Sequence, residues 1–125
     1  MLNKQMEIAK IAYNNIKDNI KNIQQEEEKK EYKSHIKHIL SLLQISGITQ
    51  AFSFALTKKK NTYNMIISDT KEYLSTLSVI KEKFKNKELI DSLLTLTSEE
   101  YMIVTSEVRD FFIWLKRFAD GLIKD

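Results

Sequence analysis

TSEEYMIVTSEVRDFFIWLKRFADGLI, residues 97–123, is the stretch that decides the fold, because it predicts one long amphipathic helix. Its apolar residues recur at alternating spacings of three and four, which places them on one helix face. They are Tyr101, Val104, Val108, Phe111, Leu115, Phe118 and Leu122. The Thr-Ser-Glu-Glu sequence at 97–100 predicts a capping box at the start of this helix. As an alternative, residues 105–107 divide the segment into a short turn and a longer helix.

The rest of the chain also predicts helices, because it contains no proline and only two glycines. All-β folds depend on both residues for their frequent turns. Periodic apolar positions predict further helices over residues 3–24, 26–46, 48–56 and 61–85, and a short one over residues 88–94. The sequence therefore predicts an all-α fold: a single-domain irregular bundle of five to six helices over residues 1–125.

The expected core follows from the apolar stripes of these helices. The stripe of the first helix is Met6, Ala9, Tyr13, Ile16, Ile20 and Ile23. The second helix contributes Tyr32, Ile36, Ile39, Leu40 and Leu43, and the fourth contributes Ile66, Thr70, Leu74, Leu77 and Phe84. The third is apolar nearly all round, so it is expected at the centre of the core. Gly47 should end the second helix as a cap residue with positive φ.

Composition and length set the broad class of the protein. The chain has 125 residues, 42% hydrophobic and 30% charged, which is typical of one globular domain. It has no cysteine, so disulfides and thiolate chemistry are excluded. The beginning, MLNKQMEIAK, lacks the apolar region of a secretory signal, and no apolar run approaches the ~20 residues of a membrane span. We therefore expect a cytoplasmic protein without a membrane contact.

Catalytic and cofactor motifs are missing from the sequence. With glycine only at positions 47 and 121, no phosphate-binding GxGxxG or Walker-type loop is present. His35 and His38 are three residues apart, and Glu31 would be the third ligand of a hypothetical metal site, but no established metal motif matches. We interpret both histidines as solvent-facing structural residues. The sequence predicts a protein that is not an enzyme and has no catalytic residues, cofactor or metal.

Positive charge is concentrated in the first half of the chain. Residues 1–60 hold 11 lysines against 6 acidic residues, whereas residues 61–125 hold 9 Lys or Arg against 11 acidic residues. Lys10, Lys17 and Lys21 share one face of the first helix, a row of about 16 Å that could follow a phosphate backbone. The other basic groups are Lys30, Lys33 and Lys37 on the second helix, Lys58 to Lys60 after the third, and Arg109, Lys116 and Arg117 beside Trp114 on the last. For each row the alternative is a solvated helix face with i, i+4 partners.

Two segments resemble a known family. SGITQAFSFAL, residues 46–56, resembles the glycine-led apolar helix of the small helical subunit of the type III-B CRISPR-associated Cmr RNA-silencing complex. The C-terminal block of that family has a Tyr, then Thr-x-Glu, then Trp-Leu-Lys-Arg-Phe-Ala. Here these are Tyr101, Thr105, Glu107 and residues 114–119. The stretch around Ala9, Ala12 and Tyr13 is compatible with the family as well.

The resemblance implies a non-catalytic role in antiviral defence. Subunits of this kind stack on one another beside other Cmr-complex subunits and help to bind guide RNA and target RNA, while other chains cut. RNA contacts would be made to the backbone, and base pairing would supply specificity. We expect them at Lys10, Lys17 and Lys21 and at Arg109, Lys116 and Arg117, with Trp114 packed rather than stacked on a base. Two places that are often basic in the family hold Gln44 and Met102 here, so no RNA contact is expected there.

A rival interpretation needs no nucleic acid. In it the chain is a helical protein–protein interaction module, which buries an apolar groove on a partner and uses its lysines only for solubility. Co-purification with small RNAs would separate the two interpretations.

Overall fold

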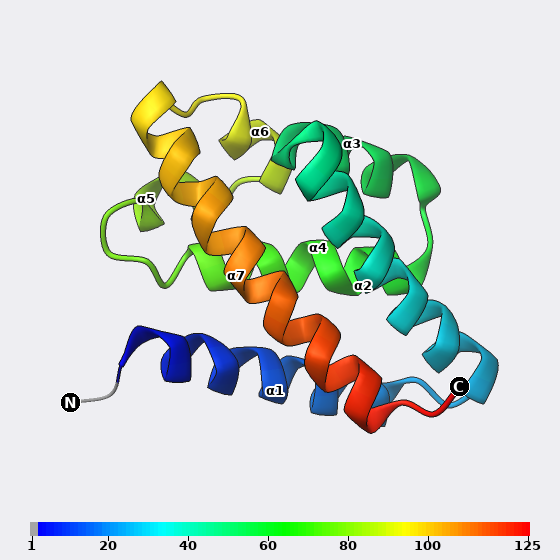
Figure 1. Ribbon diagram of the computed structural model, residues 1–125. Helices are drawn as coiled ribbons and strands as arrows, with labels where there is room; N and C mark the ends of the chain where they lie inside the picture. Colours follow the sequence, from blue (N-terminus) through cyan, green and yellow to red (C-terminus); the bar gives the residue numbers. More distant parts are fainter. Residues whose placement is uncertain (1–2) are drawn as a thin grey trace.

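Seven helices make up residues 3–125, the part of the chain that the computed structural model describes (Figure 1). They are α1 (Lys4–Asn22), α2 (Glu26–Ser46), α3 (Ile48–Lys58), α4 (Asn61–Leu74), α5 (Lys81–Phe84), α6 (Leu89–Leu93) and α7 (Ser98–Leu122). Within those residues there is no strand, so the all-α prediction is confirmed. The seven helices are one more than the upper end of the predicted range of five to six.

The additional helix arises because the helix expected over residues 61–85 stops at Leu74. The Ser75 hydroxyl donates to the Lys71 carbonyl at 2.8 Å, and the Thr76 hydroxyl donates to the Tyr73 carbonyl at 2.6 Å. From Thr76 on, the backbone amides bond three residues back instead of four, to Tyr73 and Leu74, so the regular α-helix is not continued. The chain therefore turns after α4 and forms the short α5 separately, which still buries Phe84 as expected.

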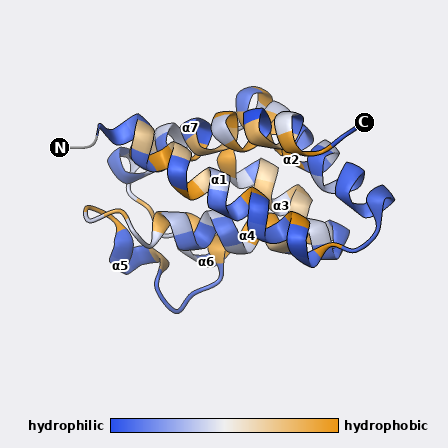
Figure 2. Cartoon of the chain, turned by 90° about the horizontal axis from the view of Figure 1, so that it is seen from below, coloured by the Kyte–Doolittle hydropathy of each residue, from blue (hydrophilic) through white to orange (hydrophobic). Residues whose placement is uncertain are grey.

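The helices form two sides around α3. Helices α2 and α7 lie on one side and α4, α5 and α6 on the other (Figure 2). α1 packs mainly against α7 and runs in the same direction, since Lys4 contacts Glu107 and Tyr13 contacts Phe118. The third helix is central, as predicted. Its fully buried residues are Ile48, Ala51, Phe52 and Ala55.

The buried face of α1 differs from the prediction. Met6 and Tyr13, expected inside, are 56% and 38% exposed, whereas Ile8 and Ala12 are buried beside Ile16. α1 packs against α4 as well as against α7, so its buried face is centred between the two neighbours rather than on one heptad-like seam. This shift leaves an apolar edge of α1 at the surface.

The segment 98–122 is one continuous helix, and the alternative division at residues 105–107 was wrong. Both hydrogen bonds of the predicted capping box are present: the Glu100 amide donates to Thr97 Oγ1 at 3.1 Å, and the Thr97 amide donates to Glu100 Oε1 at 2.9 Å. Phe112 and Ala119 join the predicted stripe in the core, while Leu122 is largely exposed. A face wider than the stripe is buried because α1, α2 and α4 all pack against α7.

Gly47 separates α2 from α3, and its backbone has φ 90° and ψ 170°. This confirms the predicted positive φ. A side chain at this position would also meet Tyr101, because an added Cβ would lie 3.3 Å from the Tyr101 hydroxyl. Glycine thus suits the backbone conformation and leaves room for the Tyr101 hydroxyl of α7.

A partly buried polar cluster joins α1, α2 and α4. The side-chain amide of Asn19 donates to the Tyr32 hydroxyl at 2.8 Å and to Asp69 Oδ2 at 2.7 Å. Burial raises the pKa of Asp69 to about 6, although the bond from Asn19 opposes the shift, and the nearby Glu72 and Asp18 add to it. The cluster satisfies polar groups inside the helix junction but holds an acid that is easily protonated.

Replacing Asp69 by Asn should remove a pH-dependent part of the stability. Because the pKa of Asp69 is raised from 3.8 to about 6 on folding, the folded state binds more protons between these values. The stabilisation by the protonated acid is therefore present at low pH and is lost as the pH rises through this window. We expect Asp69→Asn to flatten the wild-type decline in urea midpoint between about pH 4 and pH 6. Asp91→Asn, on the exposed side of α6, should leave the decline unchanged, and an equal effect of both variants would contradict the assignment.

Candidate nucleic-acid interface

The predicted lysine row on α1 is a free basic face. Lys10, Lys17 and Lys21 are all exposed, and none forms an ion pair with any residue from 3 to 125. Their helical spacing places them on the side of α1 that faces away from α4. Three unneutralised ammonium groups along one helix can contact successive phosphates.

Three aromatic side chains connect this row to α7. Trp114 stacks on Phe118 with ring centroids 5.6 Å apart, and Phe118 meets the ring of Tyr13 edge-on at 5.1 Å. We call Tyr13, Phe118 and Trp114 the aromatic bridge. At one end the ammonium of Lys17 lies 5.3 Å from the Tyr13 ring centroid, and at the other the guanidinium of Arg117 lies 5.0 Å from the Trp114 ring. The bridge therefore joins one cation of each predicted patch into a continuous surface.

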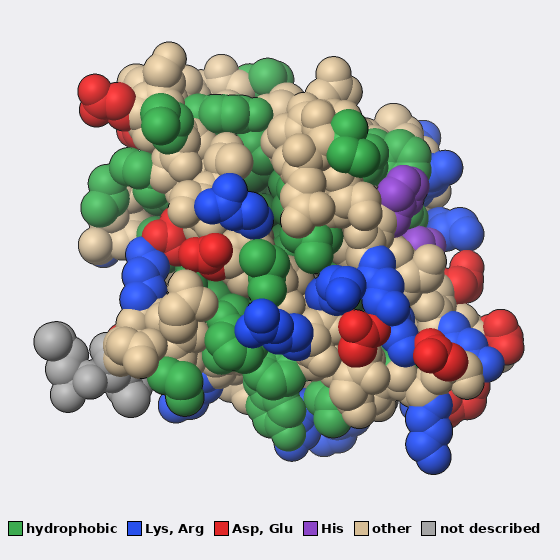
Figure 3. All heavy atoms as spheres, in the orientation of Figure 1, with side chains coloured by type: hydrophobic (Ala, Val, Ile, Leu, Met, Phe, Trp, Pro, Cys, Tyr) green, Lys and Arg blue, Asp and Glu red, His purple; other side chains and the backbone are tan. Residues whose placement is uncertain are grey.

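Trp114 is held in place, as predicted, rather than free. Its indole N–H donates to Gln5 Oε1 at 2.9 Å, while Phe118 and Arg117 contact its ring. Beside it, a groove of about 400 Å³ runs between α1 and α7 and is lined by Met6, Ala9, Lys10, Tyr13 and Phe118. Figure 3 shows the resulting face, on which Lys and Arg side chains, with acidic ones between them, lie next to apolar side chains over α1 and α7.

The three basic residues predicted on α7 are not equivalent. Arg109 and Arg117 are exposed and form no ion pair within residues 3–125. The ammonium of Lys116 lies 3.8 Å from Asp120 Oδ2 on the next turn. Lys37 of α2 also binds Asp120 at 2.8 Å, and this bond holds the pKa of the Asp120 carboxyl below its usual value. The α7 patch thus contains two free arginines and one partly neutralised lysine.

A second groove, of about 390 Å³, lies between α2 and α7. Its walls carry positive and neutral polar groups above an apolar base. The lining residues are Lys37, Leu40, Ser41, Gln44, Ile113, Lys116 and Arg117. Arg117 borders this groove and also contacts Trp114 of the aromatic bridge.

The second-helix row does not form a basic face. Lys33 is buried at 6% exposure, and its ammonium donates to the Ile123 carbonyl at 3.1 Å and to Asp125 at 2.5 Å. Lys30 and Lys37 pair with acidic side chains. The spacing of the lysines could not show that the C-terminal end of α7 lies beside Lys33. The carbonyl and acidic groups at that helix end favour a cation, and Lys33 supplies it.

The histidines have packing roles. His35 is half-buried rather than solvent-facing, since its ring stacks on Tyr63 at 3.9 Å and its Nδ1 lies 2.8 Å from the Thr62 hydroxyl. Burial, with Lys60 nearby, lowers the pKa of His35. His38 is exposed and meets Phe54 edge-on. Glu31 pairs with Lys60. Residues 3–125 contain no group of three acidic or histidine side chains placed to hold a metal.

The sequence missed the contribution of Tyr13, Phe118 and Met6 to this surface. All three belong to periodic apolar positions, so their pattern predicted burial. Only the packing of α1 beside α7 shows that these positions lie at the edge of the contact.

In the part of the chain described, none of the helices combines the length and apolar character that a membrane crossing requires.

Comparison with known proteins identifies the family. The family model described as "CRISPR-associated protein (Cas_Cmr5)" matches residues 4–122, nearly the whole chain. The X-ray structure of a CRISPR-associated Cmr5 family protein from Thermus thermophilus has a similar fold, with a TM-score of 0.75 at 20% sequence identity; the match covers 98% of this chain and 100% of that one. No curated protein sequence matches significantly. The family model confirms the resemblance noted in the sequence: this chain belongs to the Cmr5 family of CRISPR-associated proteins.

Proposed function

We propose that this chain is a non-catalytic small subunit of a type III-B Cmr effector complex, and that it helps to hold RNA against its basic surface. In this role it stacks beside other subunits in the cytoplasm during antiviral defence, and other chains carry out the cleavage. Lys10, Lys17 and Lys21 form one contact with guide RNA or target RNA. Arg109, Lys116 and Arg117 form the second.

One observation carries the RNA contact: the aromatic bridge makes the two basic patches continuous. Lys17 and Arg117 stand at its two ends. An RNA strand that follows the bridge would pass from the cations of α1 to the cations of α7. Along this path it would contact apolar or positively charged side chains. Phosphates favour the ammonium and guanidinium groups, while the exposed edges of Tyr13 and Phe118 can contact sugars and bases.

The cations are expected to contribute unequally. Arg117 lies on Trp114, and its guanidinium is thereby oriented toward the strand with less loss of side-chain freedom. Lys116 must share its charge with Asp120, so its contribution should be smaller. Charge contacts of this kind do not distinguish sequences, which fits a role in which base pairing between two RNAs supplies the specificity.

Binding to an unstructured single-stranded RNA should weaken steeply with salt. If about four phosphates are neutralised, affinity should fall roughly 50-fold between 50 and 200 mM salt. Lys17→Glu combined with Lys21→Glu should weaken binding further for every RNA sequence and reduce the salt dependence. Fluorescence anisotropy with a labelled RNA measures both effects.

A matched control uses Lys85→Glu with Lys87→Glu, which changes the net charge equally on exposed residues after α5. This control should bind RNA nearly as the wild type does. Affinity that is flat between low and physiological salt, or equal losses in both double variants, would contradict RNA binding at the α1 row. Either result, together with co-purification of this chain with Cmr subunits but without RNA, would favour the interpretation as a helical protein–protein interaction module.

A further inference from the structure

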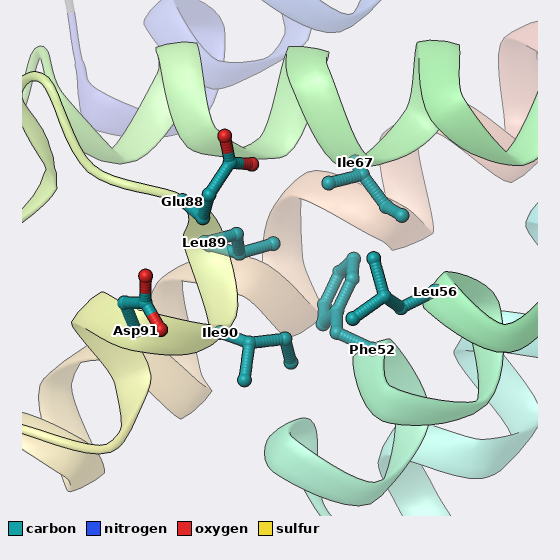
Figure 4. Close-up of a pocket in the computed structure, with 7 residues that line it drawn as sticks. All are labelled: Phe52, Leu56, Ile67, Glu88, Leu89, Ile90 and Asp91. Carbon is teal, nitrogen blue, oxygen red and sulfur yellow. The ribbon is translucent and has the colours of Figure 1, made fainter.

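An apolar hollow lies between α3, α4 and α6, away from the basic surface (Figure 4). It has a volume of about 300 Å³. Phe52 is its fully buried floor, and Leu56, 53% exposed, stands at its rim. The side chains of Ile67, Leu89 and Ile90 face the same space. A hollow of this size is at the lower end of ligand pockets and accommodates a bulky apolar side chain.

Glu88 and Asp91 lie at the α6 end of this hollow, and Figure 4 shows their carboxylates directed away from its apolar side chains. Neither forms an ion pair or a side-chain hydrogen bond with any described residue, not even with the adjacent Lys87. Both charges are therefore available to a cation from outside the chain. The combination of an apolar floor and two unpaired acids excludes an RNA backbone, since the acids repel phosphate.

From these observations we infer that the α3–α4–α6 hollow docks a protein partner whose contact segment presents a bulky apolar side chain next to Lys or Arg. The apolar side chain would enter between Leu56 and Ile90 and cover Phe52, while the basic side chain would meet Glu88 and Asp91. An anchor in a pocket surrounded by complementary charge is the usual centre of a protein interface.

The hollow is separate from the RNA-binding surface. No lining residue belongs to the aromatic bridge or to either basic patch, and α4 and α6 lie on the side of the molecule opposite α2 and α7 (Figure 2). A subunit with these two surfaces could hold an RNA strand on one side and a protein on the other. The inference does not rest on the RNA contact proposed above, and either can fail without the other.

A probe peptide tests the chemistry of the hollow. The probe is a short labelled amphipathic helix with leucine on one face and flanking lysines, and its comparison peptide has glutamates in place of the lysines. We expect only the lysine peptide to shift the amide NMR signals of residues 52, 56, 67 and 88–91. Glu88→Lys with Asp91→Lys should weaken its binding roughly tenfold. Glu7→Lys with Asp18→Lys, an equal charge change on α1, should not.

The assembled complex provides the second test. With p-benzoylphenylalanine in place of Leu56, irradiation should cross-link this chain to another protein subunit, at a segment where an apolar residue adjoins Lys or Arg. A cross-link to RNA or to a second copy of this chain, or none at all, would overturn the inference. So would equal binding of both peptides, or signal shifts outside the hollow. RNA affinity measured on the same charge-reversed variant should be unchanged, which distinguishes failure of this site from failure of the RNA surface.

Discussion

Phe52→Ala is expected to lower the free energy of unfolding by about 3–5 kcal/mol, the usual cost of deleting a buried phenylalanine ring. Phe52 is fully buried on the central helix α3, and its ring meets that of Phe112 edge-on at 5.9 Å. Truncation would remove both this contact and the floor of the α3–α4–α6 hollow, so neighbouring side chains could not collapse into the space without moving α6. Urea denaturation followed by circular dichroism measures the change.

Leu56→Ala is the matched control for Phe52→Ala, because Leu56 lies one turn later on the same helix and is 53% exposed. Its truncation should cost under about 1 kcal/mol, since little buried area is lost. Similar losses for the two variants would contradict the central position of α3. A change in the slope of the denaturation curve would show that two-state unfolding no longer holds.

Gly47→Ala is expected to cost about 2–3 kcal/mol. Backbone at φ 90° and ψ 170° lies in a region that is essentially restricted to glycine, where other residues carry roughly 1–3 kcal/mol of strain. The new Cβ would also lie 3.3 Å from the Tyr101 hydroxyl, closer than an ordinary contact. The Tyr101 side chain would have to shift by a few tenths of an ångström to admit it. Thermal unfolding at fixed pH measures the loss.

Two further variants separate the causes of this loss. Tyr101→Phe removes the hydroxyl. In that background Gly47→Ala should lower the stability by less than in the wild type, and the difference is the cost of the close contact. Gly121→Ala lies in α7, where an added Cβ meets nothing within 4 Å, and it should stabilise the protein by up to about 1 kcal/mol. If Gly47→Ala were as harmless as Gly121→Ala, the positive φ at position 47 would be wrong.

Local patterns were sufficient to predict most helix positions. The capping box at Thr97, the positive φ at Gly47 and the central α3 depend on residues close in sequence, and all three were predicted. The break after Leu74 was missed because Ser75 and Thr76 satisfy the helix pattern, although their hydroxyls bind carbonyls of the last turn of α4. Helix patterns report which residues can share a face, but not where the backbone bonds change from i−4 to i−3 partners, as they do at Thr76.

The candidate surface depended on tertiary information. The spacing of Lys10, Lys17 and Lys21 predicted their common face, and their exposure agrees with it. The burial of Lys33 and the exposure of Tyr13 could not be predicted, since each is set by a partner about 100 residues away on α7 or just after it. The spacing of residues in the sequence shows which side of its helix a side chain is on. Whether that side is exposed depends on where the other helices pack, which the spacing does not show.

The packing of α1 beside α7 has a consequence for how the chain is made. α1 is synthesised first among the seven helices, and its main partner is synthesised after all of the others. At the ribosome, helices α2 to α4 can associate with one another while the apolar side of α1 has no α7 to cover it. The domain is therefore completed by a contact between residues about 100 positions apart, and long-range contacts of this kind slow folding.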